Sequence, residues 1–464
     1  MKKLSVALVA LFLCGASLFA QDKKEIIKTG YNLGPLPVVA YDADKGFQAG
    51  AILNVFDYGD GHNYPNYDSK LYIEASFYTK GSQLYQLRYD NKELIPGVRW
   101  SSALRVNIDK AYDFYGFGGY QTYFNHELIA DGKDDPNLPL FNPFYRYSRK
   151  EMLFKSDFLG RINDNLQWEA GVFANYFNLG SIDYASINKG KDPAKKYPEG
   201  APTLFDIYKK AGVISEAEAD GGWASGLRAG LVYDSRDKEG APTRGIWAEG
   251  HITAALPGIS ETPYYRYALT WRQYLPIIGN DVLTFAYRAM YEGTFGNEAP
   301  FYALSYMTVM GEKSDLEGMG GYNTVRGIMR TRAVGLDMAT YNAELRWRFT
   351  KFTAGRQNIA LGLSAFSDGT MVTRSRDLGV LASYASALST LGSLLGTDLS
   401  SKIVTDREKD APHITVGAGF RFIMNENFIV AAEYGMPVTH FMKNSPLYNQ
   451  DGTGAFYLNL GYLF

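Results

Sequence analysis

The sequence predicts an all-β fold, namely a membrane-spanning antiparallel β-barrel of about 16 strands with long external loops. Segments of roughly ten residues alternate polar and apolar side chains along the chain, and turn-forming residues separate them. Aromatic residues make up 15% of the sequence, as expected where aromatic rings line both interfaces of a membrane. Although 46% of the residues are hydrophobic, no apolar run reaches the roughly 18 residues that a membrane helix needs.

Residues 1–20 have the layout of a cleavable secretory signal. Two lysines come first, an apolar run extends from Leu4 to Cys14, and small residues lead to Ala20. This run is too short to span a bilayer as a helix, and an N-terminal membrane anchor is the alternative interpretation. Cys14 is the only cysteine, so the exported chain is expected to contain no disulfide.

Residues 21–34 are polar and too few to form a hydrophobic core. We expect them to form a short periplasmic N-terminal segment, with the transmembrane β-barrel covering residues 35–464. Without the two signal lysines, 45 basic residues (47 − 2) stand against 49 acidic ones. This balance lacks the basic excess of a nucleic-acid-binding protein, so no nucleic-acid partner is expected.

Sixteen alternating segments are predicted as strands, an even number, as in single-chain bacterial barrels. They cover residues 35–43, 46–59, 70–80, 82–91, 97–109, 150–162, 166–178, 225–236, 245–256, 264–277, 281–293, 339–350, 358–369, 413–424, 427–438 and 454–464. The last strand must meet the first, because an open strand edge cannot face lipid.

The connections between these strands alternate in length. Short polar turns such as 163–165 and 425–427 are predicted to lie in the periplasm. The long connections, predicted to lie outside the cell, cover residues 110–148, 179–224, 294–338 and 370–412. The connection at residues 57–69 is an exception, since it is long where a tight periplasmic turn is expected.

Two of the external connections contain helical patterns. Residues 203–212 open with Thr203, have Asp206 three positions later and stop at Gly212, which resembles a capped helix. Residues 378–396 place alanine and leucine near one face at helical spacing. The second pattern is typical of a short helix on the barrel rim, and a partner-binding or membrane-surface helix is the alternative.

The segment 320–335, "GGYNTVRGIMRTRAVG", carries Arg326, Arg330 and Arg332 between glycines. An arginine that faces lipid in a barrel wall costs roughly 2–4 kcal/mol at mid-depth, so these side chains need partners inside the protein. We expect Arg326 to contribute most to the stability of the loop or the barrel, and the other two arginines to contribute less.

Three motifs and the last residue resemble the BamA/TamA superfamily of outer-membrane barrels, also called the bacterial surface antigen family. "TVRGI" (324–328) resembles the family motif of the sixth external loop, and "YDSRDKEGAPTRG" (233–245) resembles its turn between strands eight and nine. "FSDG" (366–369) resembles its acidic motif on strand thirteen. Two departures are that Ile328 replaces an aromatic residue and that glycine follows Asp368 directly.

The resemblance implies that the sixth loop folds into the barrel lumen, and it names the residues of that site. The lumen-loop motif is Val325, Arg326 and Gly327. The expected salt-bridge partner of Arg326 is Asp368, with Glu344 as the alternative. The periplasmic turn motif consists of Asp234, Arg236, Asp237, Pro242 and Gly245, and Phe464 is the terminal assembly signal.

Family members that insert or secrete proteins carry periplasmic POTRA repeats before the barrel, and residues 21–34 are too short for one. The resemblance therefore implies a barrel-only member. The first functional hypothesis is a role in outer-membrane biogenesis or protein translocation, as a subunit of a larger complex with other assembly subunits or lipoproteins. The alternatives are a passive channel for small solutes and a structural or adhesive surface barrel.

An enzymatic function is not expected. The sequence contains no G-x-S-x-G elbow. Its five histidines are isolated and lack metal-ligand spacing, so they are expected to be solvated or to lie at interfaces: His62, His126, His251, His413 and His440. No catalytic, cofactor or metal site is therefore predicted, and outer-membrane lipid is the expected surrounding partner in a Gram-negative bacterium.

Overall fold

The structure, a computed structural model, describes residues 26–42, 46–79, 81–125, 143–190, 192–193, 196–279, 281–311, 316–383, 407–460 and 463–464. The predicted signal at residues 1–20 lies outside these residues. Within the described part of the chain, no helix is long and apolar enough to cross a bilayer.

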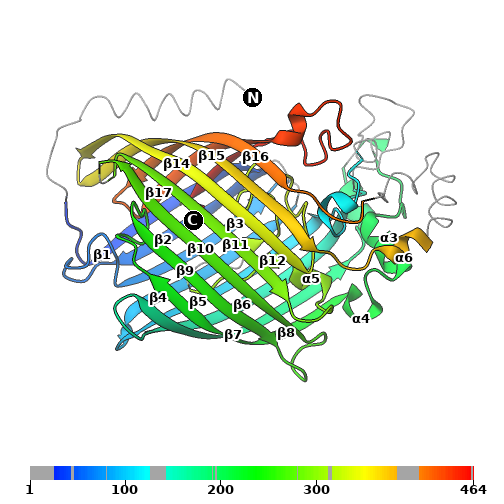
Figure 1. Ribbon diagram of the computed structural model, residues 1–464, viewed down its shortest axis with the longest axis horizontal. Helices are drawn as coiled ribbons and strands as arrows, with labels where there is room; N and C mark the ends of the chain where they lie inside the picture. The colour runs from blue at the N-terminus through cyan, green and yellow to red at the C-terminus, as the bar shows by residue number, and fades with distance from the viewer. Residues whose placement is uncertain are drawn as a thin grey trace.

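One antiparallel sheet of 16 strands forms the body of the molecule, and each strand pairs with the next along the chain (Figure 1). Its strands are β1 (Tyr31–Asp42), β2 (Gly46–Asp57), β3 (Ser69–Tyr78), β4 (Gln83–Ile95), β5 (Val98–Asp113), β6 (Arg146–Arg161), β7 (Leu166–Gly180), β8 (Gly221–Asp234), β9 (Gly245–Ala255), β10 (Tyr264–Ile278), β11 (Leu283–Thr294), β14 (Asp337–Ala354), β15 (Gln357–Arg374), β16 (His413–Met424), β17 (Phe428–Pro437) and β18 (Ala455–Leu460). Every predicted strand has a counterpart in this sheet, so the all-β barrel prediction is confirmed.

The two faces of the sheet differ in chemistry, as β14 shows. Trp347 and Leu345 point outward and are 48% and 43% exposed. The side chains of Glu344, Arg346 and Arg348 alternate with these two along the strand and point inward, and all three are buried. An apolar outer face and a charged inner face fit a barrel that meets lipid on its outside.

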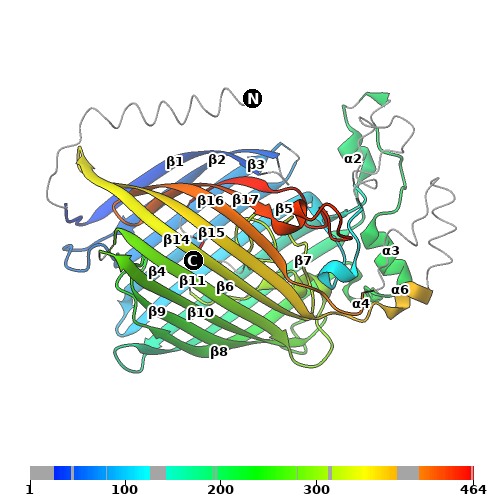
Figure 2. The same ribbon diagram turned by 45° about the horizontal axis from the view of Figure 1, so that its top comes forward.

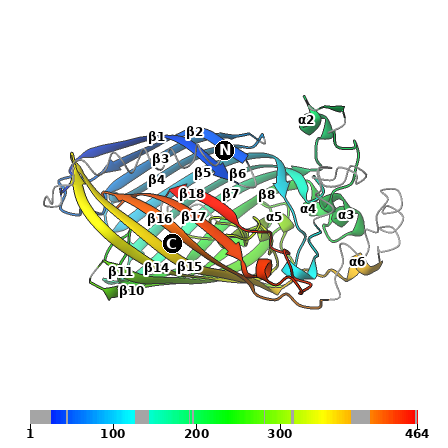
Figure 3. The ribbon, with the colours of Figure 1, turned by 90° about the horizontal axis from the view of Figure 1, so that it is seen from above.

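The first and last strands lie against each other at the seam of the barrel (Figure 3). β18 pairs with β17 over Ala455–Leu460, and the described residues include no hydrogen-bonded ladder between β18 and β1. One predicted boundary was wrong. β1 begins at Tyr31, so residues 31–34 belong to the sheet and not to the N-terminal segment. β18 covers Ala455–Leu460, and residues 461–462 of the predicted last strand lie outside the described residues.

Short turns gather at one end of the barrel and long loops at the other. The long-loop end carries α2 (Tyr184–Asn188), α3 (Leu204–Ala211), α4 (Glu216–Ala219) and α6 (Gly379–Ser383), as Figure 2 shows. The predicted helix at 203–212 is confirmed, with a Thr203–Asp206 capping box and Gly212 in the left-handed region. Of the predicted helix at 378–396, residues 384–396 lie outside the described part of the chain, and α6 covers the start.

Two segments lie across the short-turn end. The long connection after β2 reaches the turn after β16, where the Asn427 amide donates to the Tyr58 hydroxyl at 3.1 Å. The N-terminal residues cross to the turn after β14, because Ile26 and Asn358 exchange two hydrogen bonds of 3.0 Å. The Lys28 ammonium also reaches Gln357 at 3.2 Å. The 57–69 connection is long because it reaches across this end of the barrel to the turn after β16.

Residues 295–336, which we call the inner loop, connect β11 to β14, and the described parts, 295–311 and 316–336, run through the lumen. The loop contains α5 (Phe301–Leu304) and a two-residue hairpin of β12 (Tyr306–Met307) and β13 (Leu316–Glu317). Its side chains and backbone reach several strands, with Tyr306 bonding to Arg149 of β6 and Thr308 to Glu292 of β11. A loop that touches strands on different parts of the wall must lie inside the barrel.

Candidate functional site in the barrel lumen

Arg326 of the inner loop makes ionic contacts with three carboxylates of the barrel wall. Its guanidinium binds both oxygens of Asp368, with Nε 2.8 Å from Oδ2 and Nη2 3.0 Å from Oδ1. Its Nη1 lies 3.1 Å from Glu344 and 2.5 Å from Glu433. The Phe366 ring lies 3.5 Å below the guanidinium carbon, so one face of the cation is covered. The arginine is fully buried.

The structure therefore gives Arg326 three carboxylate partners where one was expected. Asp368 and Glu344 both bind it, and Glu433 of β17 had not been predicted. Burial alone would lower the pKa of Arg326, but these carboxylates outweigh burial and raise the pKa above its ordinary value. The guanidinium consequently stays charged inside the barrel.

Two further arginines complete the arrangement. Arg421 lies 2.5 Å from Glu344 and 2.7 Å from Glu433, and Arg346 lies 3.2 Å from Glu344. Together with Asp368 and Arg326 these residues form what we call the lumen network, which contains three arginines and three carboxylates. Equal numbers of opposite charges offset part of the cost of burying each one.

Glycines bring the loop close to the wall at this point. Gly327 has φ +94°, and its backbone N–H donates to the Tyr457 hydroxyl of β18 at 3.1 Å. Val325 before it is fully buried. Ile328 is also buried, so an aliphatic side chain fills the position where the family carries an aromatic one. Strands β14, β15, β17 and β18 thus all hold the two consecutive loop residues Arg326 and Gly327.

Arg330 and Arg332 were expected to contribute less to stability than Arg326, yet both make extensive contacts in the structure. Arg330 donates two hydrogen bonds to Asp113 at the end of β5, at 2.9 and 3.1 Å. Arg332 donates to three backbone carbonyls, those of Gly119, Thr122 and Gln450, at 2.8–2.9 Å. Both arginines are buried because they tie the inner loop to other long loops.

The predicted periplasmic turn motif forms the connection between β8 and β9. Asp234 accepts two hydrogen bonds from Arg236, at 2.9 and 3.0 Å. Asp237 accepts from the backbone and hydroxyl of Thr243 at 2.9 and 2.5 Å. Gly245 has φ +103°, and a Cβ there would lie 2.2 Å from the Ser235 carbonyl. The motif residues therefore fix the shape of a ten-residue turn.

This turn also crosses the short-turn end. Pro242 is buried, and the neighbouring Ala241 carbonyl accepts from Arg348 of β14 at 3.3 Å. Glu239 lies 3.3 Å from Arg99 and 2.9 Å from Lys92. Burial raises the pKa of Glu239, but the two cations outweigh burial and hold the pKa at about 2.

Phe464 lies inside the lumen, although it was predicted as the end of a strand that seals the seam. Its ring is 4% exposed and packs with Tyr274 and Ala286. Its carbonyl oxygen accepts from Arg346 at 3.1 Å, and the Arg288 guanidinium lies 5.3 Å from the ring centre. The chain end is therefore linked to the lumen network through Arg346.

The histidines were expected to be solvated or to lie at interfaces; His126 lies outside the described residues, and two of the other four are buried. His251 is 4% exposed and His413 is fully buried. The ring nitrogens of His413 lie 2.6 Å from Asp451 and 3.1 Å from Asp410. Both histidines sit on inward-facing strand positions that the loops cover. The spacing of Glu249 and His251, two apart on one strand, was the sequence signal that was missed.

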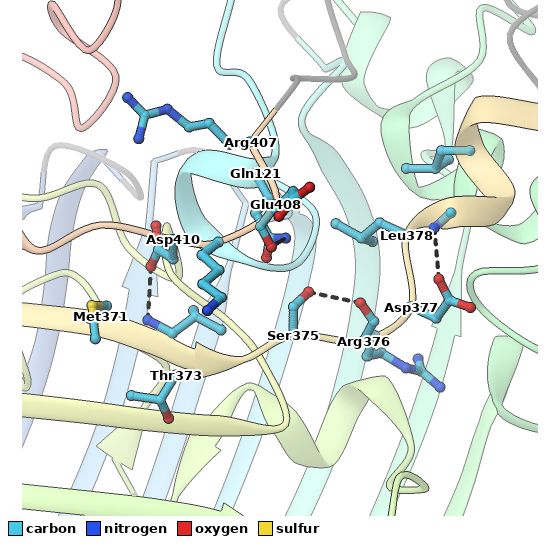
Figure 4. A pocket seen from close by; sticks show the side chains of 14 residues that line it. Gln121, Met371, Thr373, Ser375, Arg376, Asp377, Leu378, Arg407, Glu408 and Asp410 are labelled. Carbon is cyan, nitrogen blue, oxygen red and sulfur yellow. Dashed lines mark hydrogen bonds between the residues drawn. The ribbon is translucent and has the colours of Figure 1, made fainter.

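A pocket of about 710 Å³ opens at the long-loop end beside α6 (Figure 4). Its polar groups bond to their own neighbours. Ser375 donates to the Arg376 carbonyl, Asp377 accepts from Gly379, and Asp410 accepts from Val372. Several polar groups of the pocket are therefore already bonded to the pocket's own residues.

The chain matches the family model described as the Omp85 superfamily domain over residues 70–464. The chain belongs to the Omp85 superfamily. This membership places it in the bacterial outer membrane, in a superfamily whose members are mostly transporters or assembly factors.

Two solved structures are similar to this chain. CdiB from Escherichia coli is 8% identical with a TM-score of 0.50, over 95% of this chain and 63% of that chain. BamA from Haemophilus ducreyi lacking POTRA domains 1–3 is 15% identical with a TM-score of 0.48, over 98% of this chain and 77% of that chain. No curated protein matches the chain.

Proposed function

We propose that this Omp85 barrel acts in outer-membrane biogenesis or protein translocation, as a subunit of a larger complex. The observation that carries the proposal is the inner loop, which Arg326 fixes in the lumen by five hydrogen bonds to β14, β15 and β17. A barrel filled by its own ordered loop is poorly suited to passive diffusion, which requires an open aqueous lumen.

The short-turn end supports the same view. In the proposed orientation it faces the periplasm, and residues 26–28, the connection after β2 and the turn after β8 lie across it. A solute channel with both the lumen and one end filled would need two rearrangements to conduct. We place the signal at residues 1–20 and the barrel from Tyr31 onward, with outer-membrane lipid around the apolar face.

The proposal is tested by reconstituting the chain in lipid vesicles with an unfolded outer-membrane barrel as client. We expect the client to fold faster than in vesicles without the chain, as measured by its change in gel mobility on boiling. Arg326→Ala should reduce this acceleration, whereas Arg244→Ala, at an exposed turn position, should not. Equal client folding with and without the chain would contradict the proposal.

Conductance distinguishes the channel alternative. In planar bilayers the wild-type chain should show no steady open level, because the loop occupies the lumen. A steady wild-type conductance equal to that of Arg326→Ala would favour a passive channel. Purification from native membranes followed by mass spectrometry then tests for assembly subunits or lipoproteins, and recovery of the chain alone would weigh against a complex.

A further inference from the structure

A second cluster of ionisable side chains lies on the wall formed by β7, β8 and β9. Glu169 of β7 and His251 of β9 both pair with Gly230 of β8, so they share one row across the sheet. Glu249 lies two residues before His251 and points to the same face. The three side chains are 2–5% exposed. None of them contributes to the lumen network.

Gly230 leaves the space in which the cluster forms. A Cβ at this position would lie 2.6 Å from Glu169 Oε1 and 2.6 Å from His251 Cβ. The glycine thus allows the carboxylate and the imidazole to approach each other across the middle strand.

Glu169 has no hydrogen-bond partner for either carboxylate oxygen among the described residues. A carboxyl group that is almost fully buried requires a partner, because leaving its oxygens unsatisfied costs free energy. Two basic side chains of the same wall, Lys155 and Arg228, donate to the Val309 carbonyl, at 2.6 and 3.3 Å, and Lys155 also pairs with Asp157 at 3.3 Å.

The contacts of His251 show which of its two ring nitrogens faces the glutamates. Nε2 lies 3.0 Å from the Thr308 hydroxyl, and that hydroxyl donates its proton to Glu292 at 3.0–3.1 Å. The hydroxyl therefore accepts from Nε2–H, so Nδ1 is the ring nitrogen that faces the two glutamates. Nδ1 lies 3.0 Å from Glu249 Oε1 and 3.7 Å from Glu169 Oε1. One nitrogen and two carboxylate oxygens, all of a kind that binds metal ions, thus lie within 4.8 Å of one another.

We propose that Glu169, Glu249 and His251 bind a divalent transition-metal ion, with Zn²⁺ as the reference ion. Tetrahedral zinc with bonds of about 2.1 Å separates its ligand atoms by about 3.4 Å, and the two measured separations fall on either side of this value. Imidazole and carboxylate ligands suit such ions, and three protein ligands leave one position for water.

The ion would stabilise the contact between the inner loop and strands β7 to β9, which Arg326 does not contact. The Met310 backbone donates to Glu249 at 3.1 Å, and Thr308 orients His251 from the side opposite to the metal. Metal binding therefore stabilises residues 308–310 against β9. The inference is independent of the proposed function, because it concerns the position of the loop and not what the barrel transports or assembles.

The test uses the full folded chain in detergent and Zn²⁺ alone as the probe. Titration against a chromophoric chelator should show one tight site per chain in the wild type. Glu169→Gln keeps the shape of the side chain and removes its charge, and it should weaken that site at least tenfold, as should His251→Ala. His440→Gln, at the long-loop end, should bind Zn²⁺ like the wild type.

A second readout guards against loss of fold in the variants. Zn²⁺ should raise the temperature at which the wild-type chain loses its fast, unboiled gel mobility, because a ligand that binds only the folded state stabilises it. Glu169→Gln should fold without metal and show no Zn²⁺-dependent rise. An equal rise in Glu169→Gln, or a tight site retained in both cluster variants, would overturn the proposal.

Discussion

Gly327 of the inner loop and Gly435 of β17 touch backbone to backbone. A Cβ on Gly327 would lie 2.5 Å from the Gly435 carbonyl carbon, and a Cβ on Gly435 would lie 2.8 Å from the Arg326 carbonyl. This approach lets the side chain of Arg326 reach Asp368 and Glu433 while its own backbone N–H also donates to Asp368 at 3.0 Å. The glycine pair and the ionic contacts therefore depend on each other.

The first prediction concerns this contact. Gly435→Ala should destabilise the protein by about 1–3 kcal/mol, because the added carbon meets backbone atoms that cannot rotate away. Hydrogen exchange should rise at residues 324–329. Gly180→Ala is the matched control, since a Cβ there meets nothing within 4 Å. Unchanged exchange in Gly435→Ala would show that the loop is not held against β17.

Arg332 provides the second prediction. Its guanidinium satisfies three backbone carbonyls of two other long loops, and a lysine cannot reproduce this planar set of donors. We expect Arg332→Lys to lose roughly 2–4 kcal/mol of unfolding free energy. Limited proteolysis should then cut near residues 118–124 and 446–452. Protection equal to that of the wild type would mean that other contacts hold these loops.

The third prediction is a pH dependence at Glu239. Its pKa is about 2 in the folded protein and near 4.5 when unperturbed, so the ionised carboxylate stabilises the fold above about pH 4.5. This contribution is lost as the pH falls from about 4.5 to about 2. At pH 7 the free energy of unfolding of the wild type should exceed that of Glu239→Gln by about 1–3 kcal/mol. The difference between the two proteins should shrink toward zero near pH 2, and a constant difference would refute the assignment.

Phe464 gives the fourth prediction. Its ring fills a space beside Tyr274, and the chain end binds Arg346. Phe464→Ala should therefore cost about 3 kcal/mol as a core truncation and lower the amount of folded barrel in the outer membrane. Phe441→Ala is the control, because that ring is 63% exposed. Wild-type amounts of folded Phe464→Ala in the outer membrane would show that Phe464 is needed neither for assembly nor for stability.

The sequence predicted the strands well because the two faces of the wall differ so strongly. In β14, polar side chains point into the lumen and aromatic ones toward lipid, and this period of two is visible without a structure. The short helix α4 was missed, although Ser215 and Glu218 form a capping box that the sequence displays. Its four residues gave no helical periodicity to detect.

The lumen site was predictable only in part. The resemblance pointed to Arg326, Asp368 and Glu344, which the structure brings together. Glu433 lies 107 residues from Arg326 along the chain, and only the register of β16 and β17 places it there. The partners of Arg330 and Arg332 were hidden for the same reason, since they belong to loops far away in sequence.

The most direct test of the pinned loop is the free energy of unfolding in lipid vesicles for Arg326→Ala, Asp368→Asn and the double variant. Arg326→Ala leaves three carboxylates with two arginines and should cost about 3–5 kcal/mol. Asp368→Asn should cost less, because Glu344 and Glu433 still bind the arginine. The double variant restores equal charges and should be more stable than Arg326→Ala alone. Additive losses in the double variant would contradict the account.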